Sequence, residues 1–345
     1  MAKTKIEFVC RECGASHYQW AGQCLECKAW NTLEEVVTSQ VTSSRPESLK
    51  DLPSSKVQNL SEITTENKTR LTTGLSELDR TLGGGLVDGS VVLIGGDPGI
   101  GKSTLILQAL AAINQSNATL YVSGEESAEQ VSERAIRLGI KEDILFISET
   151  HLEKILKISK KVQPKVVVID SIQTMVTDLS ASAPGSVSQV RDCAAQLTQY
   201  TKQTHTILIM IGHVTKDGAI AGPKIVEHMV DTVLYFDNDL ASRFTVIRTV
   251  KNRFGATNEM GVFAMTESGF KEVKNPSAIF LSNDFVSRSG SIVSVAWEGS
   301  RPLLFEMQAL VSETHASHIK RLAQGIDQNR LPLLTAVLQK YTQIS

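Results

Sequence analysis

Short, almost uninterrupted hydrophobic runs alternate with amphipathic segments through the middle of the chain. The runs include "SVVLIGG" at 90–96, "ATLYVSG" at 118–124, "KVVVID" at 165–170 and "HTILIMIG" at 205–212. Strands that are apolar at nearly every position are typical of a parallel sheet covered by helices on both faces. The pattern therefore predicts an α/β core built on a mostly parallel sheet.

The segments between these runs have the spacing of helices. After the first run, apolar residues recur on one helical face from Leu105 to Ile113. Further helices are expected over Ser127–Leu138, from about His151 and from about Val187. Three more apolar runs follow at 231–267 with no helical pattern between them, so we expect the sheet to close with antiparallel strands.

Composition divides the chain into four parts. Four of the five cysteines fall within residues 1–36, and residues 37–69 are rich in Ser, Thr, Glu and Lys, as a linker is. The α/β pattern occupies 70–274. From about Asn275 the sequence changes again, and "SIVSVAWEGSRPLLFEMQALV" is typical of the opening hairpin of another, α+β domain over 275–345.

Composition is that of a soluble globular protein. The 345 residues are 41% hydrophobic and 21% charged, and no apolar run reaches the roughly 18 residues of a membrane span. The start, "MAKTKIEFVC", lacks a secretory signal, which favours the cytoplasm. A net charge of −2 gives no bulk attraction to nucleic acid. DNA binding would therefore require local basic surfaces or the assembly of several subunits.

The N-terminal cysteines are spaced as zinc ligands. Cys10, Cys13, Cys24 and Cys27 form two C-x2-C pairs separated by ten residues, a spacing that brings two knuckles to one tetrahedral Zn²⁺. Two disulfides or reduced bystander thiols are the alternatives. Because all four positions would be ligands, we expect a structural site without catalysis.

The most specific feature of the chain is a G-x4-G-K-[ST] loop between an expected strand and an expected helix. With the following threonine, the loop comprises Gly96, Asp97, Pro98, Gly99, Ile100, Gly101, Lys102, Ser103 and Thr104. Backbone amides of such a loop surround the β-phosphate at a helix N-terminus. Lys102 would bridge the β- and γ-phosphates and Ser103 would ligate Mg²⁺. The motif predicts ATP and Mg²⁺ as ligands.

Acidic residues follow two of the expected strands. Asp170 ends "KVVVID", where an acid can hold the hydration shell of Mg²⁺, although buried strands often end in Asp. Glu125 and Glu126 follow "YVS", and one of them could activate the attacking water. Alternatively, both simply open the next helix, where acids suit the dipole. We favour Glu125 as the base, and Glu126 would then be the cap of the next helix or a supporting group.

Two further stretches carry candidate ligands. The segment "IGHVTKDGAIAGPKIVEH" looks too loose for a helix or strand; in it, His213 could sense the γ-phosphate, and Thr215, Lys216 and Lys224 could touch a nucleic-acid backbone. A structural histidine and solvated lysines are the alternatives. In "KNRFG", Lys251 and Arg253 lie two apart on an expected strand and share a face. They form an electropositive tip, unless they are simply a solvated strand end.

Together these residues resemble the bacterial RadA/Sms family of RecA-like DNA recombination and repair ATPases. The resemblance rests on the four-cysteine finger and on five motifs: "GGDPGIGKST", "YVSGEES", "VVVIDSIQT", "GHVTKDGAIAGP" and above all "KNRFG". It covers essentially the whole chain. The family carries a Lon-protease-like C-terminal domain, and this chain resembles only the beginning of that domain. Ring assembly that depends on it is therefore in doubt. No Ser-Lys peptidase pair can be assigned.

The resemblance implies a hexameric ring on single-stranded DNA that uses ATP hydrolysis to drive branch migration of recombination intermediates together with the RecA recombinase. In such a ring, Arg253 would act in trans as an arginine finger. Lys251 could serve the same phosphate or the DNA backbone and would link nucleotide state to DNA. Two other functions stay open: a RecA-fold ATPase acting on protein, such as a clock-type kinase or peptidase regulator, and an ATP-binding scaffold with negligible turnover.

Overall fold

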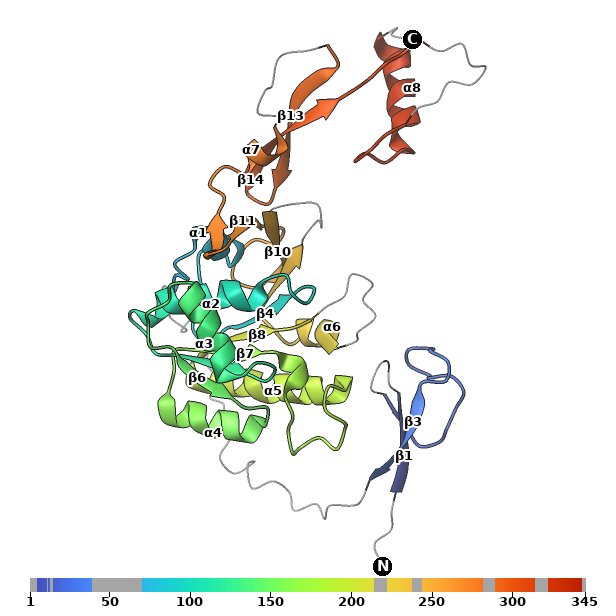
Figure 1. Ribbon diagram of the computed structural model, residues 1–345. Helices are drawn as coiled ribbons and strands as arrows, with labels where there is room; N and C mark the ends of the chain where they lie inside the picture. Colours follow the sequence, from blue (N-terminus) through green and yellow to red (C-terminus); the bar gives the residue numbers. More distant parts are fainter. Residues whose placement is uncertain are drawn as a thin grey trace, which may run out of the picture.

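A nine-stranded sheet forms the centre of the protein (Figure 1). The structure is a computed structural model that describes residues 5–10, 12, 15–38, 70–213, 222–237, 244–281, 289–313 and 322–342. Across the sheet the order is β12 (Gly269–Glu272), β11 (Met260–Thr266), β10 (Phe244–Asn252), β9 (Thr232–Asp237), β4 (Val91–Gly95), β8 (Ile207–Ile211), β7 (Val166–Asp170), β5 (Thr119–Ser123) and β6 (Leu145–Ser148). The strands from β9 to β6 run parallel, which confirms the predicted mostly parallel sheet.

Helices cover both faces of the parallel strands because successive strand residues point to opposite sides. Val92 and Ile94 join one apolar core with helices α1 (Ser76–Thr81), α2 (Lys102–Asn114) and α3 (Ala128–Arg137). Val91 and Leu93 join a second core with α4 (Leu152–Val162) and α5 (Val187–Thr204). Burial on both faces explains why these strands read as unbroken hydrophobic runs.

One part of the expected topology is wrong. Helix α6 (Gly222–Glu227) lies within the stretch that looked too loose for a helix. Its Val226, together with Val230 just beyond it, is buried against the sheet, so tertiary packing stabilises a helix that local propensity does not predict. Because α6 provides a crossover, β9 pairs parallel with β4, and the antiparallel part of the sheet begins only at β10.

Smaller elements lie at the two ends of the chain. The N-terminal strands β1 (Lys5–Cys10), β2 (Ser16–His17) and β3 (Leu33–Thr38) form an antiparallel sheet. Toward the C-terminus, β13 (Ser291–Glu298) and β14 (Arg301–Gln308) form the expected hairpin, with the helices α7 (Ser277–Phe280) and α8 (Arg330–Thr342) before and after it. Among the described residues, no helix has the length and hydropathy to cross a membrane.

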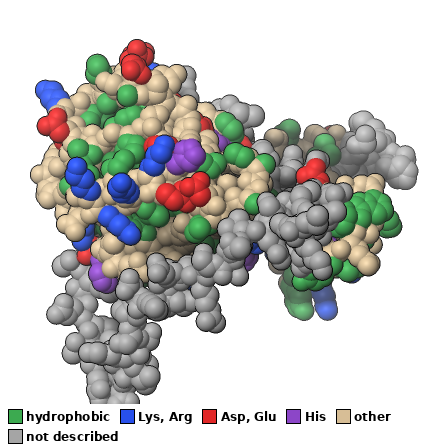
Figure 2. Space-filling model, turned by 90° about the horizontal axis from the view of Figure 1, so that it is seen from below, with side chains coloured by type: hydrophobic (Ala, Val, Ile, Leu, Met, Phe, Trp, Pro, Cys, Tyr) green, Lys and Arg blue, Asp and Glu red, His purple; other side chains and the backbone are tan. Residues whose placement is uncertain are grey.

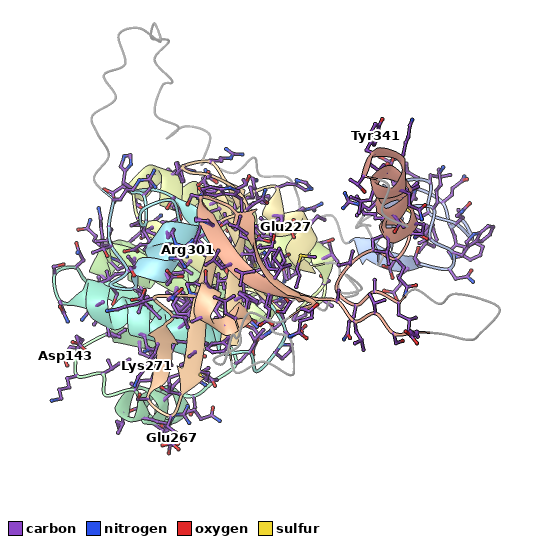
Figure 3. All side chains as sticks on the ribbon, turned by 90° about the horizontal axis from the view of Figure 1, so that it is seen from above. Asp143, Glu227, Glu267, Lys271, Arg301 and Tyr341 are labelled. Carbon is purple, nitrogen blue, oxygen red and sulfur yellow. The ribbon has the colours of Figure 1, made fainter. Side chains whose placement is uncertain are left out.

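A buried charged cluster joins the hairpin to the core. Arg301 reaches from the hairpin to α1 (Figure 3), where its Nη2 donates to Glu77 Oε1 at 2.7 Å. Arg80 donates to Glu77 at 2.7 Å and to Glu259 at 3.2 Å, and Glu259 also accepts from the backbone N–H of Ser300 at 2.9 Å. Both carboxylates are buried, so each has the partners that a buried charge requires.

Candidate functional site

The glycine-rich loop joins β4 to α2 at the carboxyl edge of the sheet. Gly96, Gly99 and Gly101 have φ angles of 149°, 77° and 101°, which residues with a Cβ rarely adopt. A Cβ at Gly101 would also lie 2.6 Å from Met265 Cε and 2.7 Å from the ring of Phe270. At Gly99 nothing lies within 4 Å of that position. The loop thus packs against β11 and β12 while leaving its backbone open at Gly99, as the close approach of a phosphate requires.

Lys102 is buried at the start of α2 and turns back over the loop. Its Nζ donates to the carbonyl oxygens of Gly96 at 2.8 Å and Asp97 at 2.7 Å, and lies 3.3 Å from Nδ1 of His213. Burial lowers the pKa of the Lys102 ammonium to about 8, although the nearby negative charges of Asp170, Asp97 and Glu125 act to raise it. The ammonium is therefore held at the loop by weak neutral acceptors that phosphate oxygens could replace.

Asp170 lies beside the loop because three neighbouring strands are in register. It pairs with Ile211 of β8, which pairs with Ile94 of β4. Asp170 is only 7% exposed, and its carboxylate accepts a hydrogen bond from the hydroxyl of Tyr121. Burial raises the pKa of the Asp170 carboxyl, whereas hydrogen bonds from Ser103 and Tyr121 lower it. The predicted Mg²⁺ ligands, Ser103 and Asp170, thus lie together.

The two adjacent glutamates have different surroundings. Glu126 is held by Arg134, whose two terminal nitrogens donate to its two oxygens at 2.6 and 2.5 Å. Glu125 instead points to the loop side, where Oε1 accepts from the hydroxyl of Ser171 and lies 3.2 Å from Nε2 of His213. The next helix is capped by Ser127, which forms a reciprocal capping box with Gln130. Neither glutamate is therefore needed as the cap.

His213 connects the catalytic candidates at this edge. It follows β8 and lies between Lys102 and Glu125, within 3.3 Å of both, and its carbonyl oxygen accepts from Nε2 of Gln173 at 3.1 Å. Thr215 and Lys216 lie outside the described residues. Lys224 falls within α6, but its side chain lies outside the described part.

The "KNRFG" segment lies at the opposite, amino edge of the sheet. Asn252, the last residue of β10, pairs with Thr232, which pairs with Val92 near the start of β4. The backbone N–H of Arg253 donates to Asp231 O at 3.0 Å. A Cβ on Gly255 would lie 2.8 Å from Gly83 Cα, so close backbone packing requires this glycine.

The two cations of this segment have different partners. Lys251 donates from Nζ to the carbonyl oxygen of Glu227 at 2.8 Å, at the C-terminal end of α6. Arg253 lies one residue beyond the strand; its side chain is 60% exposed and its Nη1 is 3.8 Å from Asp231 Oδ1. Burial and then the charge of Arg253 lower the pKa of Lys251, so the two cations are close enough to repel one another.

The N-terminal cysteines form a cluster that fits a zinc ion. The Sγ atoms of Cys10, Cys24 and Cys27 all lie within 4.8 Å of one another, and Cys10 Sγ is 3.6 Å from Cys27 Sγ. Zinc–sulfur bonds of about 2.3 Å in a tetrahedral site place two sulfurs roughly 3.8 Å apart. The Cys10–Cys27 distance is also far longer than a disulfide bond of about 2.05 Å. Cys13 lies outside the described residues.

Two buried residues, one at each edge of the sheet, were given no role from the sequence. Tyr121 reads as one more apolar strand position, although its hydroxyl contacts Asp170. Asp231 reads as a polar residue before a strand, although its Oδ2 accepts from Val91 N at 3.0 Å and from Lys202 Nζ at 2.6 Å. Neither contact leaves a signal in a single sequence, because each joins strands or helices far apart in the chain.

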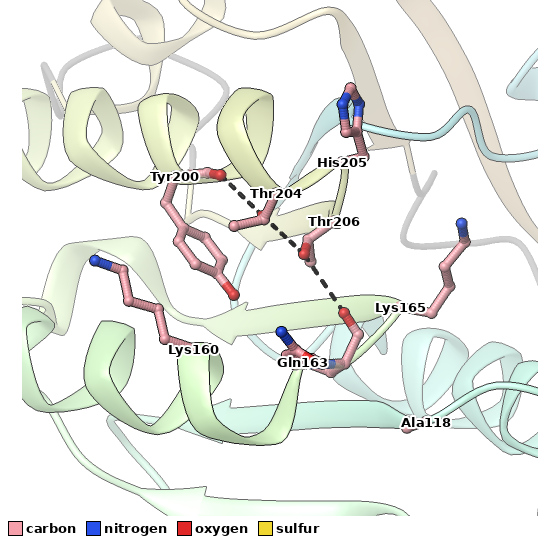
Figure 4. A pocket seen from close by; sticks show the side chains of 9 residues that line it. Ala118, Lys160, Gln163, Lys165, Tyr200, Thr204, His205 and Thr206 are labelled. Atoms are coloured by element: carbon pink, nitrogen blue, oxygen red, sulfur yellow. Dashed lines mark hydrogen bonds between the residues drawn. The ribbon is translucent and has the colours of Figure 1, made fainter. Parts of the chain in front are cut away.

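One pocket lies away from these residues. It has a volume of about 410 Å³ and opens at the amino edge of the sheet, between the ends of α4 and α5 (Figure 4). Its wall includes a chain of hydrogen bonds from Thr204 to Tyr200 O at 2.9 Å and to Thr206 at 2.9 Å. On the face seen in Figure 2, several Lys and Arg side chains lie near one another, with hydrophobic and other side chains between them and acidic side chains to their side.

The carboxyl-edge residues fit a nucleotide and its metal ion. Open backbone at Gly99 and the ammonium of Lys102 suit phosphate oxygens, and the hydroxyl of Ser103 with the carboxylate of Asp170 are the hard oxygen ligands that Mg²⁺ prefers. The fold and this cluster together define a P-loop ATPase with a RecA-like sheet.

Comparison with known proteins agrees with that class. Residues 71–271 match the family model described as KaiC, an ATPase, and residues 8–35 match the rubredoxin metal binding domain. The chain is 53% identical over 342 residues to the DNA repair protein RadA of Pseudomonas aeruginosa, a match that covers 99% of this chain and 76% of that protein. The RadA proteins of Escherichia coli and Bacillus subtilis are 52% and 48% identical, with 99% of this chain and 76% and 75% of theirs covered. The chain belongs to the RadA family, which confirms the resemblance inferred from its motifs.

Proposed function

We propose that this protein is a DNA-dependent ATPase of recombination and DNA repair, which drives branch migration of recombination intermediates on single-stranded DNA in partnership with RecA. One observation carries the proposal: the nucleotide-binding residues and "KNRFG" occupy opposite edges of one sheet. A subunit with this arrangement can complete its neighbour's site rather than its own, which is the property of a ring motor. We further propose the division into a finger (1–36), a linker (37–69), an ATPase domain (70–274) and part of a Lon-like domain (275–345).

The roles of the carboxyl-edge residues follow from their contacts. Lys102 exchanges its bonds to Gly96 O and Asp97 O for phosphate oxygens and so compensates their charge. Mg²⁺, when bound to Ser103 and Asp170, supplies further charge compensation. Glu125 orients and deprotonates the attacking water, because Glu126 is already occupied by Arg134. His213, between Lys102 and Glu125, responds to the γ-phosphate.

Arg253 acts in trans in this proposal. Its side chain is exposed and its distance to Asp231 leaves only a weak ion pair, so the guanidinium can turn to an anion presented by a neighbouring subunit. A planar, permanently charged fork suits a phosphoryl group in transfer. The result is a site shared between two subunits.

Lys251 links nucleotide state to DNA in this proposal. The hydrogen bond from its Nζ to Glu227 O ties Lys251 to the end of α6, so Lys251 connects β10 with this helix and does not act as a free phosphate ligand. The N-terminal end of α6 adjoins the segment that carries Lys216, and α6 itself carries Lys224; both lysines are the proposed DNA contacts. Lys251 would therefore connect DNA binding to the position of Arg253.

The test is ATP hydrolysis measured with and without single-stranded DNA. Stimulation by DNA that disappears in Lys102→Ala supports the proposal, and hydrolysis that ignores DNA but responds to a protein partner supports the alternative of an ATPase acting on protein.

A further inference from the structure

The hydroxyl of Tyr121 lies within the candidate ATPase site. Tyr121 belongs to β5 and is 1% exposed, and its ring stacks on Phe146 with the centroids 6.2 Å apart. The hydroxyl donates to Oδ2 of Asp170. The hydroxyl of Ser103 lies beside both groups and lowers the pKa of each of them. The three oxygens thus come from β5, β7 and the first turn of α2.

Packing alone does not explain this hydroxyl. The ring of Tyr121 belongs to the apolar core between the sheet and α2, where phenylalanine would supply the same hydrophobic contact. Burying a hydroxyl costs free energy unless it is hydrogen-bonded. Here its partners are the two residues assigned to the metal ion, and a carboxylate with a fixed donor is confined to few orientations.

We propose that Tyr121 is a positioning residue whose hydroxyl holds the Ser103 hydroxyl and the Asp170 carboxylate in the arrangement that binds the divalent cation of the nucleotide complex. This inference rests on the proposed ATPase function. It assigns Tyr121 no contact with phosphate or with the attacking water. Its effect is therefore on the dependence of nucleotide binding on Mg²⁺, and not on nucleotide binding in the absence of the metal ion.

The test is Tyr121→Phe, with binding of a fluorescent ADP analogue measured at increasing Mg²⁺ concentration. The free energy of a hydrogen bond to a charged group corresponds to about a tenfold change in affinity, so the half-saturating Mg²⁺ concentration should rise about tenfold. Nucleotide binding in EDTA should be unchanged. Tyr200→Phe, a buried tyrosine of α5 at the other edge of the sheet, is the matched control and should leave both measurements at the parental values.

A double-mutant cycle separates positioning from general stability. If Tyr121 acts through Asp170, then Tyr121→Phe added to Asp170→Asn causes no further rise in the Mg²⁺ requirement, whereas a purely structural effect adds in full. A parental Mg²⁺ requirement in Tyr121→Phe, or full additivity, overturns the inference and leaves the ATPase proposal intact. If the unmodified protein binds nucleotide with no dependence on Mg²⁺, the proposed function fails and the inference with it.

Discussion

Subunits that lack Lys102 and subunits that lack Arg253 should each be inactive alone and should complement one another when mixed. The backbone of Arg253 is level with Val91, since both bond to Asp231, and the phosphate loop begins only after Gly95. Four residues of β4, about 13 Å of strand, therefore separate the backbone of Arg253 from the start of the phosphate loop. The loop itself adds to this distance. Arg253 cannot reach the phosphates of its own subunit across this buried sheet.

The size of the effect follows from this geometry. Lys102→Ala removes a phosphate ligand, and Arg253→Ala removes a cation whose loss in comparable sites costs about 10³-fold or more in rate. In a randomly assembled equal mixture, about a quarter of the subunit boundaries combine an intact Lys102 with an intact Arg253 from the neighbour. The mixture should therefore recover about a quarter of the parental DNA-stimulated rate.

The assay is steady-state ATP hydrolysis on DNA, with subunit exchange followed independently by fluorescence energy transfer. Arg248→Ala is the matched control, because Arg248 is a partly exposed arginine of the same strand that pairs with Glu298 at 3.2 Å; this variant should keep its activity without mixing. If subunits exchange and the mixture stays inactive, Arg253 does not act in trans.

Three further predictions concern single groups. Glu125→Gln should bind ATP but hydrolyse it slowly in a single-turnover assay, and a larger loss in Glu126→Gln would reverse the assignment of the base. Cys24→Ser should lose about one zinc per chain by metal analysis and leave the thermal unfolding of the ATPase core unchanged; Cys193→Ala, at the buried cysteine outside the cluster, should keep its zinc. Because protonated Lys102 binds phosphate and its pKa is about 8, ADP affinity should be nearly full at pH 7 and fall about tenfold between pH 7 and pH 9, whereas Lys102→Arg should show a flat profile.

The sequence predicted those features that depend on local pattern. Uniformly apolar strands such as Val166–Asp170 indicated a buried parallel sheet, and the glycine-rich loop indicated where phosphates bind, because both signals arise from neighbouring residues. The carboxyl ends of parallel strands meet at one edge, so Glu125, Asp170 and His213 could be expected near Lys102 before their distances were known.

What the sequence did not predict depends on contacts between distant segments. Helix α6 forms because Val226 is buried against the sheet, and propensity alone favours a loop there. The hydroxyl of Tyr121 and the carboxylate of Asp231 gain their partners only when strands assemble. Lys251 looked like a cation free to bind phosphate or DNA. Its hydrogen bond to Glu227 O at the end of α6 could not be predicted, because the helix itself was not expected.

The most direct measurement for the central claim is the rate of ATP hydrolysis by the purified protein as single-stranded DNA is added. We expect a DNA-dependent rise in rate that is lost in Lys102→Ala and in Arg253→Ala and kept in Arg248→Ala. A rate that is the same with and without DNA in the unmodified protein, under conditions where it binds ATP, would contradict the proposed DNA-dependent ATPase activity.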